Sequence, residues 1–173
     1  VLHSDIDKIK ETLRDINTDS FVKAVDMLLS ANKIYIIGIR SCEPLASFFS
    51  FYLNLILDNV VLINTNNPSE IFEKMIRIGE GDVIFGISFP RYSVRTLKAL
   101  EFAKNRGADV ISLTDSDNSP MAIYSSCNLL AKSDMASFVD SLVAPLSVVN
   151  ALIVALSMRK DKEVKETLSL LEN

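Results

Sequence analysis

The sequence has few of the features that mark disulfide-rich, metal-binding, nucleic-acid-binding or membrane proteins. Its two cysteines, Cys42 and Cys127, stand in separate apolar settings without Cys-x-x-Cys or Cys/His spacing, so neither a disulfide scaffold nor a metal site is predicted, and a reducing cytoplasm fits best. The net charge of -4 argues against a basic surface for nucleic acid. No apolar run reaches membrane-spanning length, and no signal-peptide pattern opens the chain.

The remaining composition is that of an ordinary globular protein. The chain has 173 residues, of which 49% are hydrophobic and 23% are charged, and we predict one domain with a full core. Because the first residue is valine rather than methionine, we expect the chain to be a piece of a longer protein.

Short apolar runs alternate with segments of helical periodicity. The predicted strands are 33–38, 60–63, 83–87, 110–114 and 127–131. The predicted helices are 5–31 in two pieces, 45–57, 68–78, 93–105, 138–158 and 160–171, and Pro145 either kinks the helix over 138–158 or marks a new start. This alternation predicts an α/β fold with a parallel sheet covered on both faces and ligands outside the carboxyl ends of the strands. The aromatic stretch Phe48 to Tyr52 is expected in the core or at a dimer interface.

The stretch 82–93 is the most informative part of the chain. An apolar strand runs into a Ser/Pro/Arg turn and then into a helix start, where unpaired backbone N–H groups and the helix dipole favour a bound anion, above all phosphate. Ser88 and Ser93 add hydroxyl donors, and Arg91 adds a planar cation. The same residues also suit a plain strand-to-helix connection with serine as the helix N-cap.

Three polar loops fall at predicted strand ends, over 40–42, 88–93 and 115–119. Their surroundings read Ile-Tyr-Ile-Ile-Gly-Ile-Arg-Ser-Cys, then Gly-Asp-Val-Ile-Phe-Gly-Ile-Ser-Phe-Pro-Arg-Tyr-Ser, then Val-Ile-Ser-Leu-Thr-Asp-Ser-Asp-Asn-Ser-Pro-Met-Ala. In this order the loops resemble those of the SIS (sugar isomerase) domain. More narrowly, they resemble the sugar-phosphate-sensing domain of RpiR/MurR-type bacterial transcription regulators, over about residues 20–158.

The resemblance implies a three-layer αβα sandwich with a five-stranded parallel sheet, of the flavodoxin/Rossmann-like kind, which is usually dimeric and binds a phosphorylated sugar. The family's first loop commonly reads Gly-x-Gly-Ser-Ser. Here Gly38 and Ser41 match it, Arg40 stands at a usual glycine, and Cys42 stands at a usual serine. We expect Cys42 to be a small buried apolar group rather than a reactive thiol.

The family's second loop reads Ser-x-Ser-Gly-x-Thr, and its hydroxyls and amides hold the phosphate. Ser88 matches the first serine, Pro90 and Arg91 replace Ser-Gly, and Ser93 stands at the threonine. The two new arginines either compensate for the lost donors or pair with surface carboxylates such as Glu43. The family often closes its sugar pocket over the stretch 137–141, which makes Ser137 and Ser141 weaker candidates. The predicted phosphosugar-binding residues are Arg40, Ser41, Cys42, Ser88, Arg91, Ser93 and Ser137.

In such regulators a helix-turn-helix domain precedes the sensor. The resemblance therefore implies that residues 1–19 are the linker helix from a missing N-terminal DNA-binding domain and residues 20–173 are the SIS domain. We predict the effector-binding and dimerising half of a repressor or activator, a homodimer or higher oligomer that contacts DNA only through that domain, without a membrane partner, cofactor or metal.

Two alternatives remain. A single-domain sugar-phosphate isomerase needs a proton-transferring base, usually His or Glu. The only histidine, His3, is far in sequence from every loop, and Glu43 and Glu70 have ready roles as helix-start charges, so we predict no enzyme. A dimerisation module with a vestigial pocket is the third possibility, because the phosphate loops are altered.

Overall fold

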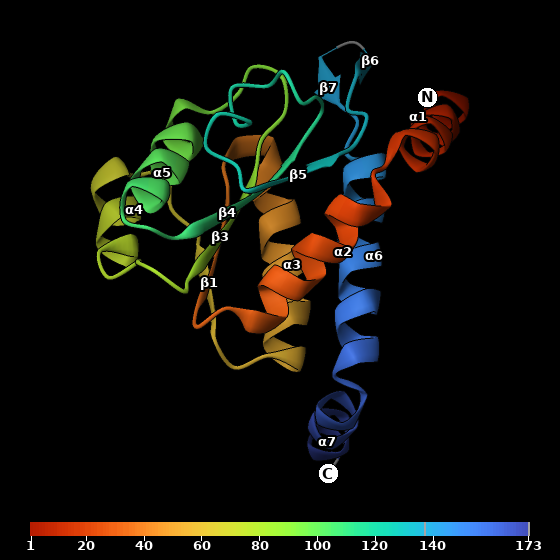
Figure 1. Cartoon of the computed structure of the whole chain (residues 1–173). Coiled ribbons are helices and arrows are strands. Elements are labelled where there is room, and N and C mark those ends of the chain that lie inside the picture. The colour runs from red at the N-terminus through yellow and green to blue at the C-terminus, as the bar shows by residue number, and fades with distance from the viewer. Residues whose placement is uncertain (137, 173) are drawn as a thin grey trace.

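A five-stranded parallel sheet forms the centre of the protein (Figure 1), which is described by a computed structural model covering residues 1–136 and 138–172. The strand order is β2-β1-β3-β4-β5, and every neighbouring pair is parallel. The strands are β1 (Ile34–Gly38), β2 (Val60–Ile63), β3 (Val83–Ile87), β4 (Asp109–Thr114) and β5 (Cys127–Leu130). The fold class predicted from the alternating pattern is confirmed.

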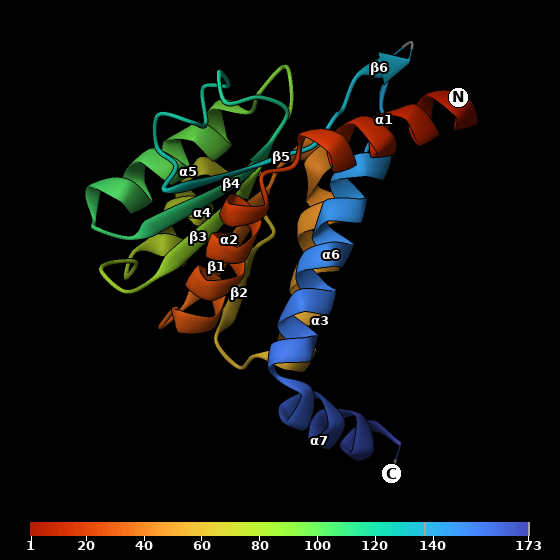
Figure 2. The same cartoon turned by 45° about the vertical axis from the view of Figure 1, so that its right-hand side comes forward.

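Helices cover both faces of this sheet (Figures 1 and 2). The helices are α1 (Leu2–Asp15), α2 (Thr18–Ser30), α3 (Glu43–Ile56), α4 (Pro68–Met75), α5 (Val94–Asn105), α6 (Val143–Arg159) and α7 (Asp161–Leu171), with a 3₁₀ turn over Arg40–Cys42. Helices α4 and α5 pack on one face, whereas α2, α3 and α6 pack on the other. Helix α1 lies across the amino end of α6, and α7 folds away from the other end of α6.

Alternate strand residues supply the two halves of the core. Ile36 and Phe85 belong to the cluster beneath α2, α3 and α6, whereas Ile37 and Ile84 belong to the cluster beneath α4 and α5. The ring of Phe49 from α3 meets Phe85 edge-on, with 4.8 Å between the ring centroids. Because such strands are buried on both faces, they are continuous apolar runs in the sequence, which is why they could be predicted.

The prediction of a helix over 138–158 was wrong in its first five residues. Val139–Asp140 forms β7, which pairs antiparallel with β6 (Met135–Ala136), and α6 begins only at Val143. Pro145 explains this start, because proline lacks the N–H group that an interior helical position donates and is tolerated only in the first turn. The predicted helix over 68–78 is likewise shorter and ends at Met75.

Helix α3 is buried on more than one side, as its sequence predicts, because it contacts the sheet, α6 and α7. Phe49 and Leu53 are fully buried. Phe51 and Tyr52 nevertheless keep 62% and 38% of their surface exposed. The aromatic stretch therefore contributes to the core and also to an apolar outer surface.

One further property of the helices concerns membranes. Among the described residues no single helix is both long enough and apolar enough to cross a bilayer. Helices α6 and α7 pass that test only as a pair, by length and composition, and they are bent by 98° where they meet.

Candidate functional site

A cavity of about 490 Å³ lies at the carboxyl edge of the sheet. The loop after β1, the loop after β3 and the segment around β7 surround it. Its lining residues are Ile39, Arg40, Ser41, Cys42, Ser88, Phe89, Pro90, Arg91, Ser93, Phe138, Val139, Asp140 and Leu142. Six of the seven predicted ligand-binding residues therefore line one cavity, and the seventh, Ser137, lies outside the described residues.

The third predicted loop, over 115–119, does not line this cavity. It packs beside the second loop instead, where the Tyr92 hydroxyl donates to Asp115 Oδ1 at 2.6 Å. Burial, followed by the contact with Asp115, raises the pKa of Tyr92 well above its usual value. The third wall of the cavity comes from the segment around β7, within the stretch 137–141 that the resemblance placed over the sugar pocket.

The first loop turns sharply because Gly38 has no side chain. A Cβ atom on Gly38 would lie 2.4 Å from the backbone oxygen of Cys42, which is far inside van der Waals contact. Cys42 itself is buried, and burial raises the pKa of its thiol to about 11. The uncharged thiol at neutral pH agrees with the expected role as a small apolar group.

The second loop is held by its two serines. The Ser93 amide donates to Ser88 Oγ at 3.1 Å, and the Thr96 amide donates to Ser93 Oγ at 3.4 Å, so Ser93 is the N-cap of α5. Ser88 is nearly fully buried, and its own amide donates to the backbone oxygen of Leu113 at 3.2 Å. Both hydroxyls thus accept bonds within the loop and each keeps its own hydrogen to donate. The N-cap function and a ligand-binding function are compatible here.

Arg40 and Arg91 are the only non-glycine residues with positive φ in the described part of the chain, at 59° and 64°. These are the two positions at which this chain has arginine where the resembled loops carry glycine. The loops therefore keep the left-handed backbone of a glycine while adding a cationic side chain. For an L-residue this conformation costs about 1–2 kcal/mol, and such cost is commonly found where a residue serves a ligand rather than stability.

Asp140 is the carboxylate of the cavity, and the sequence analysis missed it. The Ser41 hydroxyl donates to Asp140 Oδ2 at 3.0 Å, and Arg91 Nη2 lies 3.5 Å from Asp140 Oδ1. Arg91 thus has a carboxylate partner, although not Glu43, which accepts a bond from the Ser47 hydroxyl. The exposed Arg40 has no ion-pair partner in the described ranges. The only sequence signal for Asp140 was its place within the stretch 137–141, in which the predicted candidates were Ser137 and Ser141.

Ser141, the other weaker candidate, points elsewhere. Its hydroxyl donates to Asp5 Oδ1 of α1 at 2.6 Å, and it is not among the residues that line the cavity. The segment that carries Asp140 into the cavity is therefore attached to α1 by the next residue.

The side chains considered as catalytic bases lie outside the cavity. His3 is exposed in the first turn of α1, and the Thr65 hydroxyl donates to Glu70 at 2.5 Å. No group of three His, Cys, Asp or Glu residues that could hold a metal ion occurs in the part of the chain that the structure describes. Among the described lining residues, the polar groups are two guanidinium groups, three serine hydroxyls, the Cys42 thiol and one carboxylate.

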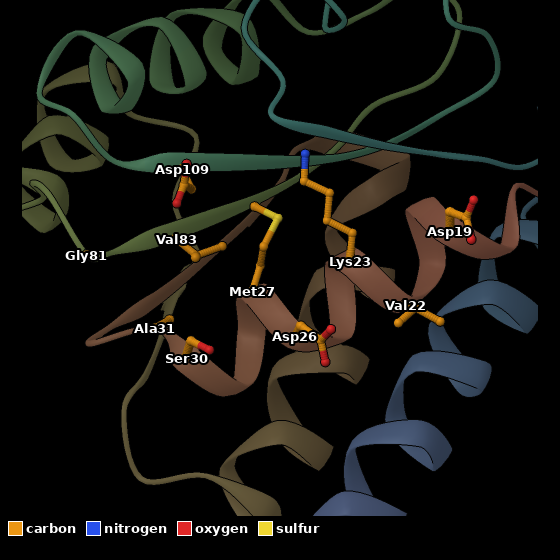
Figure 3. Close-up of a pocket in the computed structure, with 10 residues that line it drawn as sticks. All are labelled: Asp19, Val22, Lys23, Asp26, Met27, Ser30, Ala31, Gly81, Val83 and Asp109. Atoms are coloured by element: carbon orange, nitrogen blue, oxygen red, sulfur yellow. The ribbon is translucent and has the colours of Figure 1, made fainter.

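A larger hollow of about 570 Å³ runs beside α2 at the amino end of β3 and β4 (Figure 3). Its charged groups are Asp19, Asp26, Asp109 and Lys23, and the Lys23 ammonium group donates to the backbone oxygen of Ser126 at 2.7 Å. This excess of carboxylates does not suit an anion, and the hollow is at the opposite edge of the sheet from the polar loops. The smaller cavity is therefore the better candidate site.

The strain at Arg40 can be tested with paired substitutions. Arg40→Gly and Arg40→Ala both remove the guanidinium group and differ only in the Cβ atom, so we expect the glycine variant to be the more stable by about 1 kcal/mol. At Lys98, an exposed position inside α5, the order of the glycine and alanine variants should reverse by a similar amount, because glycine is unfavourable in a helix interior. Chemical denaturation of the four variants measures both differences, and the same order at both positions would contradict the left-handed conformation of Arg40.

A doubly covered parallel sheet with a polar cavity at its carboxyl edge defines the class of α/β domains that bind small ligands at strand ends. The model of the SIS domain family matches residues 27–155, which is most of the chain, and the chain belongs to this family.

Individual proteins are similar over a greater length. An uncharacterized HTH-type transcriptional regulator of Caldanaerobacter subterraneus subsp. tengcongensis is 28% identical over 160 residues, which are 90% of this chain and 56% of that protein. The chain thus spans about half the length of this relative. The crystal structure of the sugar isomerase domain of an RpiR transcription factor from Sphaerobacter thermophilus has a TM-score of 0.94 at 24% identity and covers 99% of this chain and 96% of that one.

Two further solved structures share the fold at lower identity. NanR of Vibrio vulnificus, complexed with ManNAc-6P, has a TM-score of 0.86 at 21% identity over 98% of this chain and 66% of that one. Phosphoheptose isomerase of Neisseria gonorrhoeae has a TM-score of 0.75 at 16% identity over 91% of this chain and 95% of that one. The fold is therefore found in regulators and in isomerases.

Proposed function

We propose that this SIS domain is the sugar-phosphate-binding effector domain of an RpiR-type bacterial transcription regulator. The observation that carries the proposal is the convergence of Arg40, Arg91 and the serine hydroxyls on one cavity at the carboxyl edge of the sheet. The relative named as an HTH-type regulator and the complex of NanR with ManNAc-6P support it.

The phosphoryl group is proposed to bind between the first and second loops. Arg40 and Arg91 supply charge and paired N–H donors, and Ser41, Ser88 and Ser93 supply hydroxyl donors. The amides of Arg91 and Tyr92 have no hydrogen-bond partner within the described ranges, so they are available to an anion. The left-handed conformation of Arg91 is one that backbone N–H groups adopt where they line a concave anion site.

The rest of the proposed regulator lies outside this domain. Residues 1–19 are proposed as the linker helix to an N-terminal DNA-binding domain, the only part that contacts DNA, and the 56% share of the HTH-type relative supports this division. Phe51 and Tyr52 of α3 and Met158 of α6 are exposed, and we propose that such apolar surface joins two copies into a homodimer. The cytoplasm remains the proposed location, and both cysteines are free thiols.

Catalysis is not part of the proposed function. Isomerisation of a sugar phosphate needs a group that moves a proton between neighbouring carbons, and neither His nor Glu is among the described residues that line the cavity. Turnover of hexulose or aldose phosphates by the purified protein would overturn this part of the proposal.

The binding function is tested by thermal shift and calorimetry with a panel of sugar phosphates. We expect at least one hexose, hexosamine or N-acetylhexosamine phosphate to stabilise the protein, by about 2.7 kcal/mol at 100 times its dissociation constant. The same sugars without phosphate are the control and should have little effect. If no sugar phosphate in the panel binds, the domain is a dimerisation module with a vestigial pocket.

A further inference from the structure

The cavity contains an anion that belongs to the protein. Asp140 Oδ2 accepts the Ser41 hydroxyl at 3.0 Å, and Asp140 Oδ1 lies 3.5 Å from Arg91 Nη2. One donor comes from the loop after β1 and the other from the loop after β3, so this single carboxylate joins the two loops. Its side chain keeps only 16% of its surface exposed, whereas that of Arg91 keeps 68%.

The two donors held by Asp140 are among the groups that the proposed function assigns to the phosphoryl group. A phosphate oxygen and a carboxylate oxygen accept from hydroxyl and guanidinium donors in the same way. Two anions that share these donors also repel each other across a partly buried cavity. Because Ser41 has a single hydroxyl hydrogen, a phosphoryl group that accepts it must displace the carboxylate from Ser41.

We propose that Asp140 is an internal competitor of the ligand, and that it determines which anions the site accepts. The inference rests on the proposed function, since it concerns the same cavity. A weak anion with few contacts does not displace the carboxylate. A sugar phosphate gains contacts from both its phosphoryl group and its hydroxyls, and it can do so.

A contact between the segment that carries Asp140 and helix α1 also holds Asp140 in position. Ser141 follows Asp140 in the chain and donates to Asp5 Oδ1 at 2.6 Å, and Lys8 Nζ lies 3.9 Å from the same oxygen. Displacement of Asp140 pulls on the contact between Ser141 and Asp5. By the reciprocity of linked equilibria, loss of this contact makes the displacement of Asp140 easier.

The decisive variant is Asp140→Asn, which keeps the size of the side chain and an oxygen for the Ser41 hydroxyl but removes the charge. Inorganic phosphate and the sugar phosphate that binds best are titrated by calorimetry into the wild type and the variant. We expect the variant to bind both about tenfold more tightly and by a similar factor, because each ligand displaces the same carboxylate. Asp134→Asn is the matched control, because Asp134 is exposed and does not line the cavity, and it should leave both affinities unchanged.

A second variant, Ser141→Ala, keeps the proposal testable if Asp140→Asn does not fold. Ser141→Ala leaves every cavity residue in place and should raise the affinity for phosphate by a smaller factor, about threefold, since it only loosens the attachment of the segment. Amide hydrogen exchange should also show faster exchange in α1 when phosphate saturates the wild type. Unchanged exchange in α1 would show that the displacement of Asp140 is not transmitted to α1 through the contact between Ser141 and Asp5.

The results distinguish a failure of the proposed competition by Asp140 from a failure of the proposed sugar-phosphate binding. If the wild type binds a sugar phosphate and Asp140→Asn binds it equally or more weakly, Asp140 is a ligand-binding or structural group and the inference is wrong, whereas the proposed function stands. If neither protein binds any phosphate at millimolar concentration, the proposed function fails and the inference fails with it.

Discussion

Replacement of Gly38 by alanine should lower the free energy of unfolding by about 3 kcal/mol, and the midpoint of thermal unfolding by roughly 6–12 °C. The new Cβ atom would lie 2.4 Å from the backbone oxygen and 2.9 Å from the backbone carbon of Cys42. These are main-chain atoms in the turn that joins β1 to α3, so no side-chain rotation relieves the contact. The turn itself has to move, and with it Arg40 and Ser41.

Gly79, which precedes β3, provides the control for this result. A Cβ atom on Gly79 would lie 3.7 Å from the backbone oxygen of Arg106, which is ordinary van der Waals contact. Gly79→Ala should therefore be neutral or stabilising by up to about 1 kcal/mol. Denaturant unfolding of both variants, with phosphate titrations alongside, makes the comparison. If Gly38→Ala is as stable as Gly79→Ala, the tight approach of Cys42 to Gly38 is incorrect.

The sheet could be predicted from the sequence because each strand is an apolar run between turn residues. β2 and β3 were predicted with the ends that the structure shows, and each of the other three strands differs by one residue at one end. Local patterns of this kind depend on nearest neighbours and on burial on both faces. The start of α6 at Val143 required a further rule, because only the position of Pro145 within the first turn sets it.

The site was predictable where single loops carry it and not where distant segments meet. The loops with Arg40 and Arg91 follow strands directly, so their place at the sheet edge follows from the topology. Asp140 lies in a strand of two residues, too short to give any periodic signal, and its partners are 99 and 49 positions away in the chain. The left-handed conformation of the two arginines was equally hidden, since arginine shows no preference for it.

The largest effect on binding is expected when both cavity arginines are removed. Each guanidinium group can form charge-assisted hydrogen bonds with a phosphoryl group, worth about 1.5 kcal/mol or more. Arg40→Ala and Arg91→Ala should each weaken sugar-phosphate binding about tenfold, and the double variant about a hundredfold. Arg77→Ala removes the same charge at an exposed position outside the cavity, and we expect it to change the affinity by less than about twofold.

The two arginines should differ in how their substitution depends on Asp140, because Arg91 forms an ion pair with Asp140 and Arg40 does not. With Asp140 present, Arg91→Ala removes a donor to the ligand, which lowers the affinity. It also removes a partner of the competing carboxylate, which raises the affinity, so the two effects partly cancel. In an Asp140→Asn background the cancellation is absent, and Arg91→Ala should cost more affinity than it does in the wild type. The Arg40 side chain has no such partner among the described residues, so Arg40→Ala should lower the affinity by the same factor in both backgrounds. Calorimetric double-mutant cycles measure both couplings, and a cycle for Arg91 that is additive within about 0.5 kcal/mol would show that Asp140 does not compete with the ligand for this arginine.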